Sequence, residues 1–99
     1  MSDYFNDYFS LIDEKSKSVD YKVLVTASEL ADKANKDGGK IIIVGNGGSA
    51  AIASHVSIDF TKAAGMRSIS FNESSLITCF SNDYGYENWV ARALEFYAD

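Results

Sequence analysis

The sequence has no proline and only one cysteine, one histidine and one tryptophan. The single cysteine, Cys79, excludes an internal disulfide bond and fits a reducing compartment. No run of residues is long and apolar enough to span a membrane. Residues 1–9 read MSDYFNDYF and lack the basic and apolar regions of a secretory signal peptide. Together these absences predict a cytoplasmic protein.

Basic residues are few and scattered along the chain. There are 9 Lys and Arg against 14 Asp and Glu, which gives a formal net charge of −5. A domain that binds nucleic acid usually carries a basic patch, and none is visible here. The length of 99 residues allows one domain. We therefore expect a single domain that contacts neither nucleic acid nor a membrane.

The most informative stretch is residues 45–59, which read GNGGSAAIASHVSID and directly follow the apolar run 41–44. A short β-branched run, then glycines, then an alanine-rich segment predicts a strand, a tight loop and the N-terminus of a helix. Unpaired N–H groups and the helix dipole favour an anion at such a terminus, most often a phosphate. Ser49 is the expected N-cap, and its hydroxyl is a further candidate contact.

The only histidine, His55, and the carboxylate of Asp59 stand four residues apart on the helix that the glycine loop opens. Positions i and i+4 share one helix face. The pair fits half of a zinc site, an acid/base pair for moving a proton on a sugar carbon, or a hydrogen-bonded pair without chemistry. Taking Ile52, Val56 and Ala63 as the core stripe of this helix places both side chains at its edge.

Helical spacing of apolar residues predicts two leading helices, over residues 4–15 and 20–35. Asp20 or Ser18 is the expected cap of the second helix, and Gly38 and Gly39 end it. We expect the two helices to form a helical hairpin over residues 1–37 that buries an oligomer interface. After the glycine-loop helix, the pattern predicts a second strand at 68–71, a short helix at 76–80 that Ser74 or Ser75 caps, and a final helix at 87–98.

The final helix is expected to turn five side chains inward: Trp89, Val90, Ala93, Leu94 and Tyr97. The chain stops inside this helical pattern without a capping glycine. Only two strands are predicted, whereas parallel sheets are covered on both faces and usually carry more strands. The sequence therefore predicts the first part of a larger α/β domain.

A second polar loop is predicted at residues 81–85, after the second strand. Asn82 and Asp83 in this loop are either substrate contacts at the carboxyl edge of the sheet or a self-satisfied Asx turn. Cys79 is interpreted as a buried small apolar residue rather than a nucleophile.

Glycine loops also bind nucleotides in two well-known classes of protein, the P-loop NTPases and the dinucleotide-binding enzymes. The loop is not a Walker A motif, because no Gly-Lys-Ser/Thr follows the glycines, and this argues against an NTPase. Gly45, Gly47 and Ala50 satisfy the loose dinucleotide fingerprint, with Glu73 as the ribose acid. This alternative leaves His55 and Asp59 without a role.

GNGGSAAIASHVSID, FSNDYGYE and WVARALE resemble the phosphoheptose isomerases of the sugar isomerase (SIS) domain superfamily. The resemblance spans nearly the whole chain and implies a three-layer αβα fold with a five-stranded parallel sheet. Residues 1–99 would be its N-terminal part. It further implies a homotetramer with sites at subunit interfaces. The implied reaction converts sedoheptulose 7-phosphate to D-glycero-D-manno-heptose 7-phosphate, for heptose synthesis in lipopolysaccharide or capsule.

The resemblance also assigns roles to residues. Six match positions that bind substrate or lie beside it: Asn46, Gly47, Gly48, Ser49, Asn82 and Asp83. His55 matches a zinc ligand at the catalytic centre. Asp59 stands where the family has Glu, which serves as metal ligand and catalytic base. Asp is one methylene shorter, and a displacement of about 1 Å can cost on the order of 10²-fold in rate.

The family's second, serine-rich phosphate loop and its C-terminal Gln and His would follow Asp99. We therefore expect these 99 residues to be inactive alone and the full-length parent to be an isomerase. The alternative is a non-catalytic SIS module that binds a phosphosugar or another protein.

Overall fold

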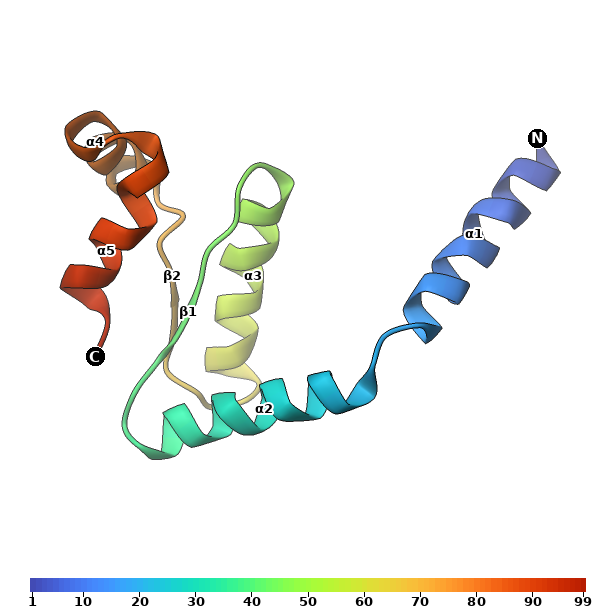
Figure 1. Cartoon of the computed structure of the whole chain (residues 1–99), viewed down its shortest axis with the longest axis horizontal. Helices are drawn as coiled ribbons and strands as arrows, with labels where there is room; N and C mark the ends of the chain where they lie inside the picture. Colours follow the sequence, from blue (N-terminus) through green and yellow to red (C-terminus); the bar gives the residue numbers. More distant parts are fainter.

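The computed structural model describes all residues from Met1 to Asp99. Eight elements follow one another along the chain (Figure 1): α1 Ser2–Lys17, α2 Tyr21–Lys36, β1 Ile41–Ile43, α3 Gly48–Lys62, β2 Ser68–Ser70, α4 Ser74–Tyr84, the 3-10 helix η1 Tyr86–Asn88 and α5 Trp89–Tyr97. The predicted α/β class with a parallel sheet is confirmed.

The sheet consists of two parallel strands. β1 pairs with β2 so that Ile42 lies opposite Ile69. Both strands are shorter than the sequence predicts, because Val44 and Phe71 leave the ladder. They remain packed in the interior, where Phe71 is 2% exposed and Val44 packs against its cluster.

Helices cover both faces of this sheet. α3 packs against the two strands on one face, and α4 and α5 lie on the other (Figure 1). The main core forms on the α5 side, where Phe71, Trp89 and Ala93 cluster with Ile42 and Val44. Trp89 and Ala93 are buried as predicted, whereas the other expected inward residues of α5 are only half-buried or exposed.

On the other face, α3 meets the sheet through small side chains. Ala53 and Ser57 are its buried residues. The predicted core stripe is wrong in part, because Ile52 is 64% exposed and Ala63 is also exposed, while Val56 is half-buried. Small side chains let a helix approach the strands closely. The small residues Ala53 and Ser57 therefore face the sheet in place of the larger Ile52.

α4 is longer than predicted and absorbs most of the expected second loop. Its N-cap is Glu73, whose carboxylate accepts the N–H of Leu76 at 3.0 Å, rather than Ser74 or Ser75. The N–H groups of Ser75 and Leu76 hold the pKa of Glu73 below its ordinary value. Because this carboxylate already accepts a hydrogen bond from the first turn of α4, it is less available to bind the ribose of a dinucleotide.

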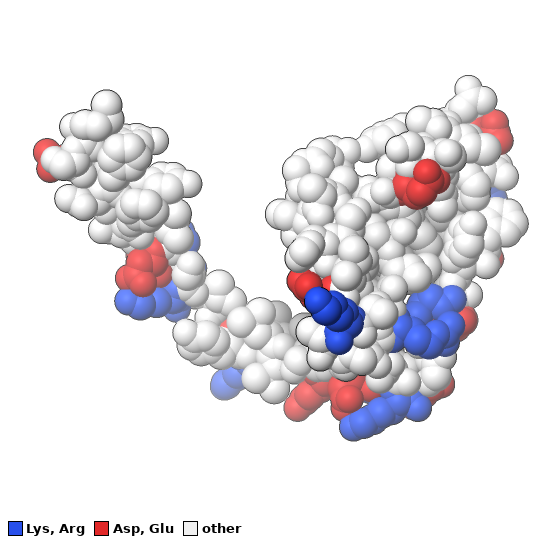
Figure 2. All heavy atoms as spheres, turned by 180° about the vertical axis from the view of Figure 1, so that it is seen from behind, with Lys and Arg blue, Asp and Glu red and all other residues white.

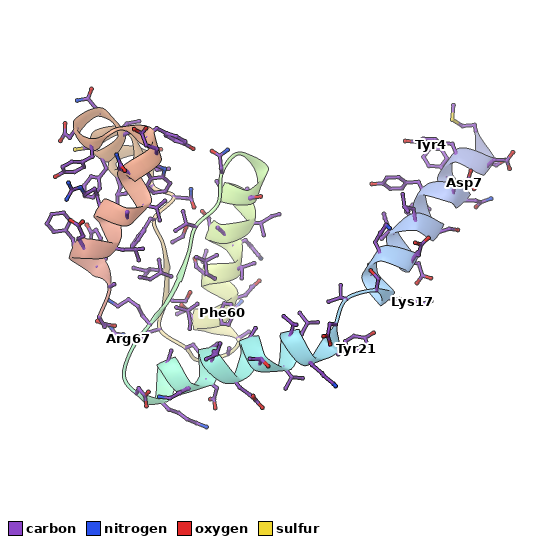
Figure 3. The ribbon with its side chains drawn as sticks, viewed as in Figure 1. Tyr4, Asp7, Lys17, Tyr21, Phe60 and Arg67 are labelled. Atoms are coloured by element: carbon purple, nitrogen blue, oxygen red, sulfur yellow. The ribbon has the colours of Figure 1, made fainter.

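α1 and α2 do not form the expected hairpin. Asp20 caps α2 as predicted, accepting the N–H of Lys22 at 2.9 Å. α1, however, contacts no other element and extends away from the body, with Tyr4 near its free end (Figures 1 and 3). The hairpin of residues 1–37 is therefore not closed within this chain.

The molecule exposes far more surface than a compact protein of its mass. Its accessible surface is 7366 Å², against about 5,500 Å² expected for a folded monomer of this mass. The radius of gyration is 17.2 Å, against about 12.6 Å for a compact domain of this length. On the face shown in Figure 2, charged side chains gather along α2 and the adjoining edge of the body, and acidic atoms also mark the tip of α1, whose first turn carries Asp3. None of the helices combines the length and apolar character needed to cross a bilayer.

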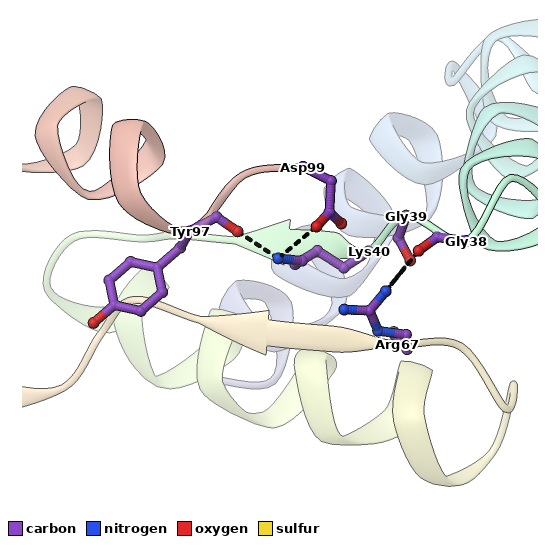
Figure 4. A network of polar contacts seen from close by, with 6 residues as sticks. All are labelled: Gly38, Gly39, Lys40, Arg67, Tyr97 and Asp99. Carbon is purple, nitrogen blue, oxygen red and sulfur yellow. Dashed lines mark hydrogen bonds and ion pairs between the residues drawn. The ribbon is translucent and has the colours of Figure 1, made fainter.

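At the amino ends of the strands, two basic side chains tie distant segments together (Figure 4). Lys40 donates to the carbonyl oxygen of Tyr97 and pairs with Asp99 at 3.1 Å. Arg67 donates to the carbonyl oxygen of Gly38 at 2.6 Å. These contacts anchor the end of α5 and the lead-in to β1 at the edge of the sheet opposite the glycine loop.

Candidate functional site at the carboxyl edge of the sheet

The loop after β1 turns sharply into α3. Gly47 is the N-cap, with φ 57° and ψ −126°, and the helix begins at Gly48. The expected cap Ser49 is wrong, because it already lies in the first turn and no side chain caps this terminus. Positive φ at Gly47 is the conformation that favours glycine, so backbone shape rather than a side-chain cap sets the helix start.

Gly45 is required by close packing within the loop. A Cβ built on Gly45 would lie 2.1 Å from the carbonyl oxygen of Ser49 and 2.7 Å from the nitrogen of Ala50. Both are backbone atoms of the first turn of α3, so neither can rotate away. Any side chain at this position would force the loop off the helix.

The loop presents unpaired donors to solvent. The backbone N–H groups of Asn46, Gly47 and Gly48 make no hydrogen bond, and all three residues are exposed. The first turn of α3 carries no acidic residue. Free N–H groups at the positive end of a helix dipole attract an anion or a polar oxygen atom. The free backbone donors expected from the sequence are therefore present, and the binding of an anion by them stays a prediction.

Two residues that the sequence analysis did not assign to the site hold this loop. The side chain of Asn72, just past β2, accepts the N–H of Gly45 at 2.9 Å and donates to its carbonyl oxygen at 2.7 Å. The hydroxyl of Tyr86 donates to Oδ1 of Asn46 at 2.5 Å. The only sequence signal for Asn72 was its place directly after the second strand.

His55 and Asp59 lie together on the exposed side of α3. His55 Nε2 is 3.5 Å from Asp59 Oδ2, and the side chains are 76% and 59% exposed. Asp59 also borders an open apolar hollow of about 220 Å³ with Val56, Phe60 and Ala64; Phe60 lies toward the C-terminal end of α3 (Figure 3). An imidazole and a carboxylate in this arrangement can exchange a proton or share a metal ion.

The donor set for a metal is half complete. His55 and Asp59 supply an imidazole nitrogen and a carboxylate oxygen, both suited to zinc, which takes four ligands. No group of three or more His, Cys, Asp or Glu side chains forms anywhere in the chain. Within these 99 residues the pair can provide two ligands of a metal site.

Asn82 and Asp83 occupy the last turn of α4 rather than a loop, which corrects the expected position. Asn82 donates to Asp83 Oδ1 at 3.1 Å, and the Sγ of Cys79 lies 3.7 Å from Asp83 Oδ2. Cys79 is exposed, so the expectation of a buried cysteine is wrong. Asp83 lines a polar hollow of about 510 Å³ together with Arg92 and Glu95.

The structure brings some of these groups together and leaves others apart. The bonds from Asn72 and Tyr86 place the segments after β2 and after α4 beside the glycine loop, at the carboxyl edge of the sheet. This is where open parallel sheets bind ligands. No hydrogen bond joins Asn82 or Asp83 to the loop, and the substrate roles assigned to them stay predictions.

Several known proteins similar to this chain carry the same name, phosphoheptose isomerase. No family model matches the chain. Phosphoheptose isomerase of Roseiflexus sp. (strain RS-1) is 35% identical over 100 residues, covering 86% of this chain and 51% of that protein. Phosphoheptose isomerase of Aneurinibacillus thermoaerophilus is 32% identical over 106 residues, covering 96% and 54%. Phosphoheptose isomerase of Helicobacter pylori (strain HPAG1) is 44% identical over 63 residues, covering 58% and 33%. The chain spans about half the length of the first two relatives.

Proposed function

This chain is a homologue of the phosphoheptose isomerases over about half of their length, and we propose that the natural protein containing it is a phosphosugar aldose–ketose isomerase. Sedoheptulose 7-phosphate is the proposed substrate and the manno-heptose 7-phosphate the product. One structural observation carries most of the weight. The exposed His55–Asp59 pair stands on the helix whose N-terminus carries the unpaired amides of Gly47 and Gly48.

Substrate binding is proposed at the loop. The free N–H groups of Asn46, Gly47 and Gly48 donate to oxygen atoms of the phosphosugar, and the hydroxyl of Ser49 lies beside them. Asn46 adds the Nδ2 group of its side chain, because its Oδ1 is engaged by Tyr86. Hydrogen bonds from fixed amides orient the sugar, and orientation is a large part of what such a site contributes to rate.

The reaction moves a proton between neighbouring carbons of the sugar. In the proposed mechanism the carboxylate of Asp59 takes the proton from C1 and returns it to C2, while the hydroxyl proton on O1 is transferred to O2, so that C1 becomes the aldehyde and the C2 ketone becomes a hydroxyl group. The His55 imidazole, 3.5 Å away, orients the carboxylate. A zinc ion held by His55 and Asp59 would polarise the sugar oxygen beside the proton transfer. Zinc is part of the proposal because these two donors are the type it prefers.

We further propose a homo-oligomer, a tetramer by resemblance. α1 and α2 expose apolar side chains along most of their length: Tyr4, Phe5, Tyr8, Phe9, Leu11, Ile12, Val23, Leu24 and Leu30. Because α1 contacts nothing in its own chain, another copy is the proposed cover for this face. Exposed apolar patches of this extent mark interaction surfaces. Sedimentation of the natural protein tests this, and a monomer at micromolar concentration would contradict it.

A non-catalytic SIS module is the second candidate. One point favours it: by the family resemblance, Asp59 stands where the isomerases have Glu. A module of this kind would bind a phosphosugar, or another protein, without converting it.

The deciding experiment is an isomerase assay of the full natural protein with sedoheptulose 7-phosphate, with and without added zinc. Turnover that His55→Ala abolishes supports the isomerase. Binding of the sugar phosphate without turnover by the wild-type protein supports the module. Absence of both turnover and binding would refute the isomerase and the phosphosugar-binding module alike. The isolated 99-residue chain is the control, for which we expect no turnover.

A further inference from the structure

Asn72 joins the two βα units at the point where the ligand is proposed to bind. Its side-chain amide forms two hydrogen bonds with the same residue, Gly45, at 2.9 Å to the N–H and 2.7 Å to the carbonyl oxygen. Such a pair fixes both the position and the rotation of the Gly45 residue. Gly45 in turn lies against the first turn of α3 with no space for a Cβ, so the position of Gly45 determines where the loop can lie.

The orientation of the Asn72 amide is itself fixed. Ser70 Oγ donates to Asn72 Oδ1 at 3.3 Å, and the backbone N–H of Asn72 donates to Ser70 Oγ at 3.2 Å. The residue is half-buried. Because both the oxygen and the nitrogen of the Asn72 amide are hydrogen-bonded, its rotation is limited. The side chain therefore forms a rigid connection between the end of β2 and the loop after β1.

Tyr86 holds the next residue of the loop. Its hydroxyl donates to Asn46 Oδ1, so the acceptor end of the Asn46 amide is occupied. The donor end, Nδ2, makes no hydrogen bond within the chain. Tyr86 thus selects the rotation of Asn46 that offers a donor, rather than an acceptor, to a ligand oxygen.

From these contacts we infer that Asn72 and Tyr86 are positioning residues, which preset the loop 45–49 for an oxygen-rich ligand. The inference rests on the proposed function of this loop. Neither residue needs to touch the ligand. Each lowers the entropy lost on binding, because the free amides of the loop are already aligned before the ligand arrives.

The test uses the full natural protein with Asn72→Asp, Asn72→Ala and a matched control. Asp keeps the shape and the acceptor oxygen but places a second oxygen where Nδ2 donates to the Gly45 carbonyl. The control is Arg67→Ala. Arg67 also donates a side-chain hydrogen bond to a backbone carbonyl, that of Gly38 at 2.6 Å, but this bond lies at the amino ends of the two strands, away from the loop.

Two readouts separate positioning from general stability. The first is hydrogen exchange, without ligand, at the hydrogen-bonded amides of Gly45, Ser49 and Ala50. The Asn72 variants should speed exchange here, and Arg67→Ala should not. The second is kinetics with sedoheptulose 7-phosphate: KM should rise about 3- to 30-fold with kcat within about twofold, as expected for the loss of one or two hydrogen bonds. A merely structural role would lower the active fraction and leave KM unchanged.

Tyr86→Phe keeps the inference testable if the Asn72 variants do not fold. Tyr86 is 54% exposed and the change removes one hydroxyl, so the protein should keep its thermal stability. KM should rise about 2- to 10-fold.

The outcomes distinguish the two proposals. If the wild-type protein neither binds nor turns over the sugar phosphate, the proposed function fails, and the exchange experiment still decides whether Asn72 holds the loop. Unchanged exchange at Gly45 in both Asn72 variants, or equal acceleration in Arg67→Ala, overturns the role of Asn72. Unchanged KM in Tyr86→Phe, with an active wild type, overturns that of Tyr86.

Discussion

Replacing Gly45 with alanine is the sharpest test of the loop geometry. The new methyl group would lie 2.1 Å from the Ser49 carbonyl oxygen, 2.3 Å from the Ser49 carbonyl carbon and 2.7 Å from the Ala50 nitrogen. All three are backbone atoms of a helix, so the clash can be relieved only by moving the loop or the first turn of α3. Overpacking that shifts backbone costs about 1–3 kcal/mol, and we expect Gly45→Ala to lie at the upper end.

Gly48→Ala is the matched control three residues along the same loop. A Cβ on Gly48 meets nothing within 4 Å, and Gly48 already has helical geometry. Alanine there should leave the free energy of unfolding unchanged or raise it by up to about 1 kcal/mol.

Thermal unfolding followed by circular dichroism measures the difference. A loss of about 3 kcal/mol corresponds to roughly 10–25 °C in Tm for a domain of this size. Phosphosugar binding should fall with it in Gly45→Ala. A Tm of Gly45→Ala within about 2 °C of that of Gly48→Ala would refute the steric reasoning, because a clash of about 3 kcal/mol predicts a larger shift.

Three further substitutions test other parts of the molecule. Asp59→Glu restores the longer carboxylate of the isomerases and should raise turnover of the full protein by about tenfold or more if reach limits the rate; no change in turnover would contradict this. Glu73→Gln should flatten the acid limb of the stability curve. The folded-state pKa of Glu73 is depressed, so the stabilisation from its carboxylate is present above its unfolded pKa and is lost as pH falls through the folded value. Unfolding midpoints between pH 6 and 3 check this, and identical curves for variant and wild type would contradict it. Lys40→Met should cost about 1–2 kcal/mol, because it removes the contacts to Tyr97 and Asp99 from a side chain only 16% exposed; urea unfolding measures it, and a loss below about 0.3 kcal/mol would count against the anchor.

Local patterns were sufficient to predict the order and type of the elements. The β-branched run at 41–44 predicted β1, and Asp20 predicted the start of α2 through its own side chain. Both features depend on a few neighbouring residues, because backbone propensity and capping chemistry dominate at that range.

Two kinds of prediction were wrong: the two ends of α4, and the side of α3 that faces the sheet. Glu73, rather than a serine, caps α4, so the helix starts early, and Asn82 and Asp83 continue it in spite of their turn propensity. On α3, hydrophobicity favoured Ile52 as a core residue, yet Ala53 and Ser57 are buried. The side that faces the sheet depends on the distance between the two layers, which composition alone does not give.

For the site, the sequence predicted the loop and the His55–Asp59 pair but not the residues that hold the loop. Asn72 and Tyr86 lie 27 and 40 residues from their partners. Such contacts depend on how the two βα units are placed side by side, and no spacing rule encodes that. The expected hairpin of the first two helices does not form, for the same reason. Amphipathic spacing shows that a helix has an apolar face to bury, but it does not show which segment packs against that face.

The isolation of α1 links its secondary structure to the proposed homo-oligomer. A helix of 16 residues without tertiary support is close to the length at which helix and coil are equally stable in water. Its own ties are modest: the exposed Lys17–Asp13 pair and stacked aromatic rings such as Tyr4 and Tyr8. In a dilute solution of separate chains, α1 would therefore sample the coil, and its helix content would rise with protein concentration. The N-terminal helix would fold as it binds, so the same contacts that select the partner would also complete the helix.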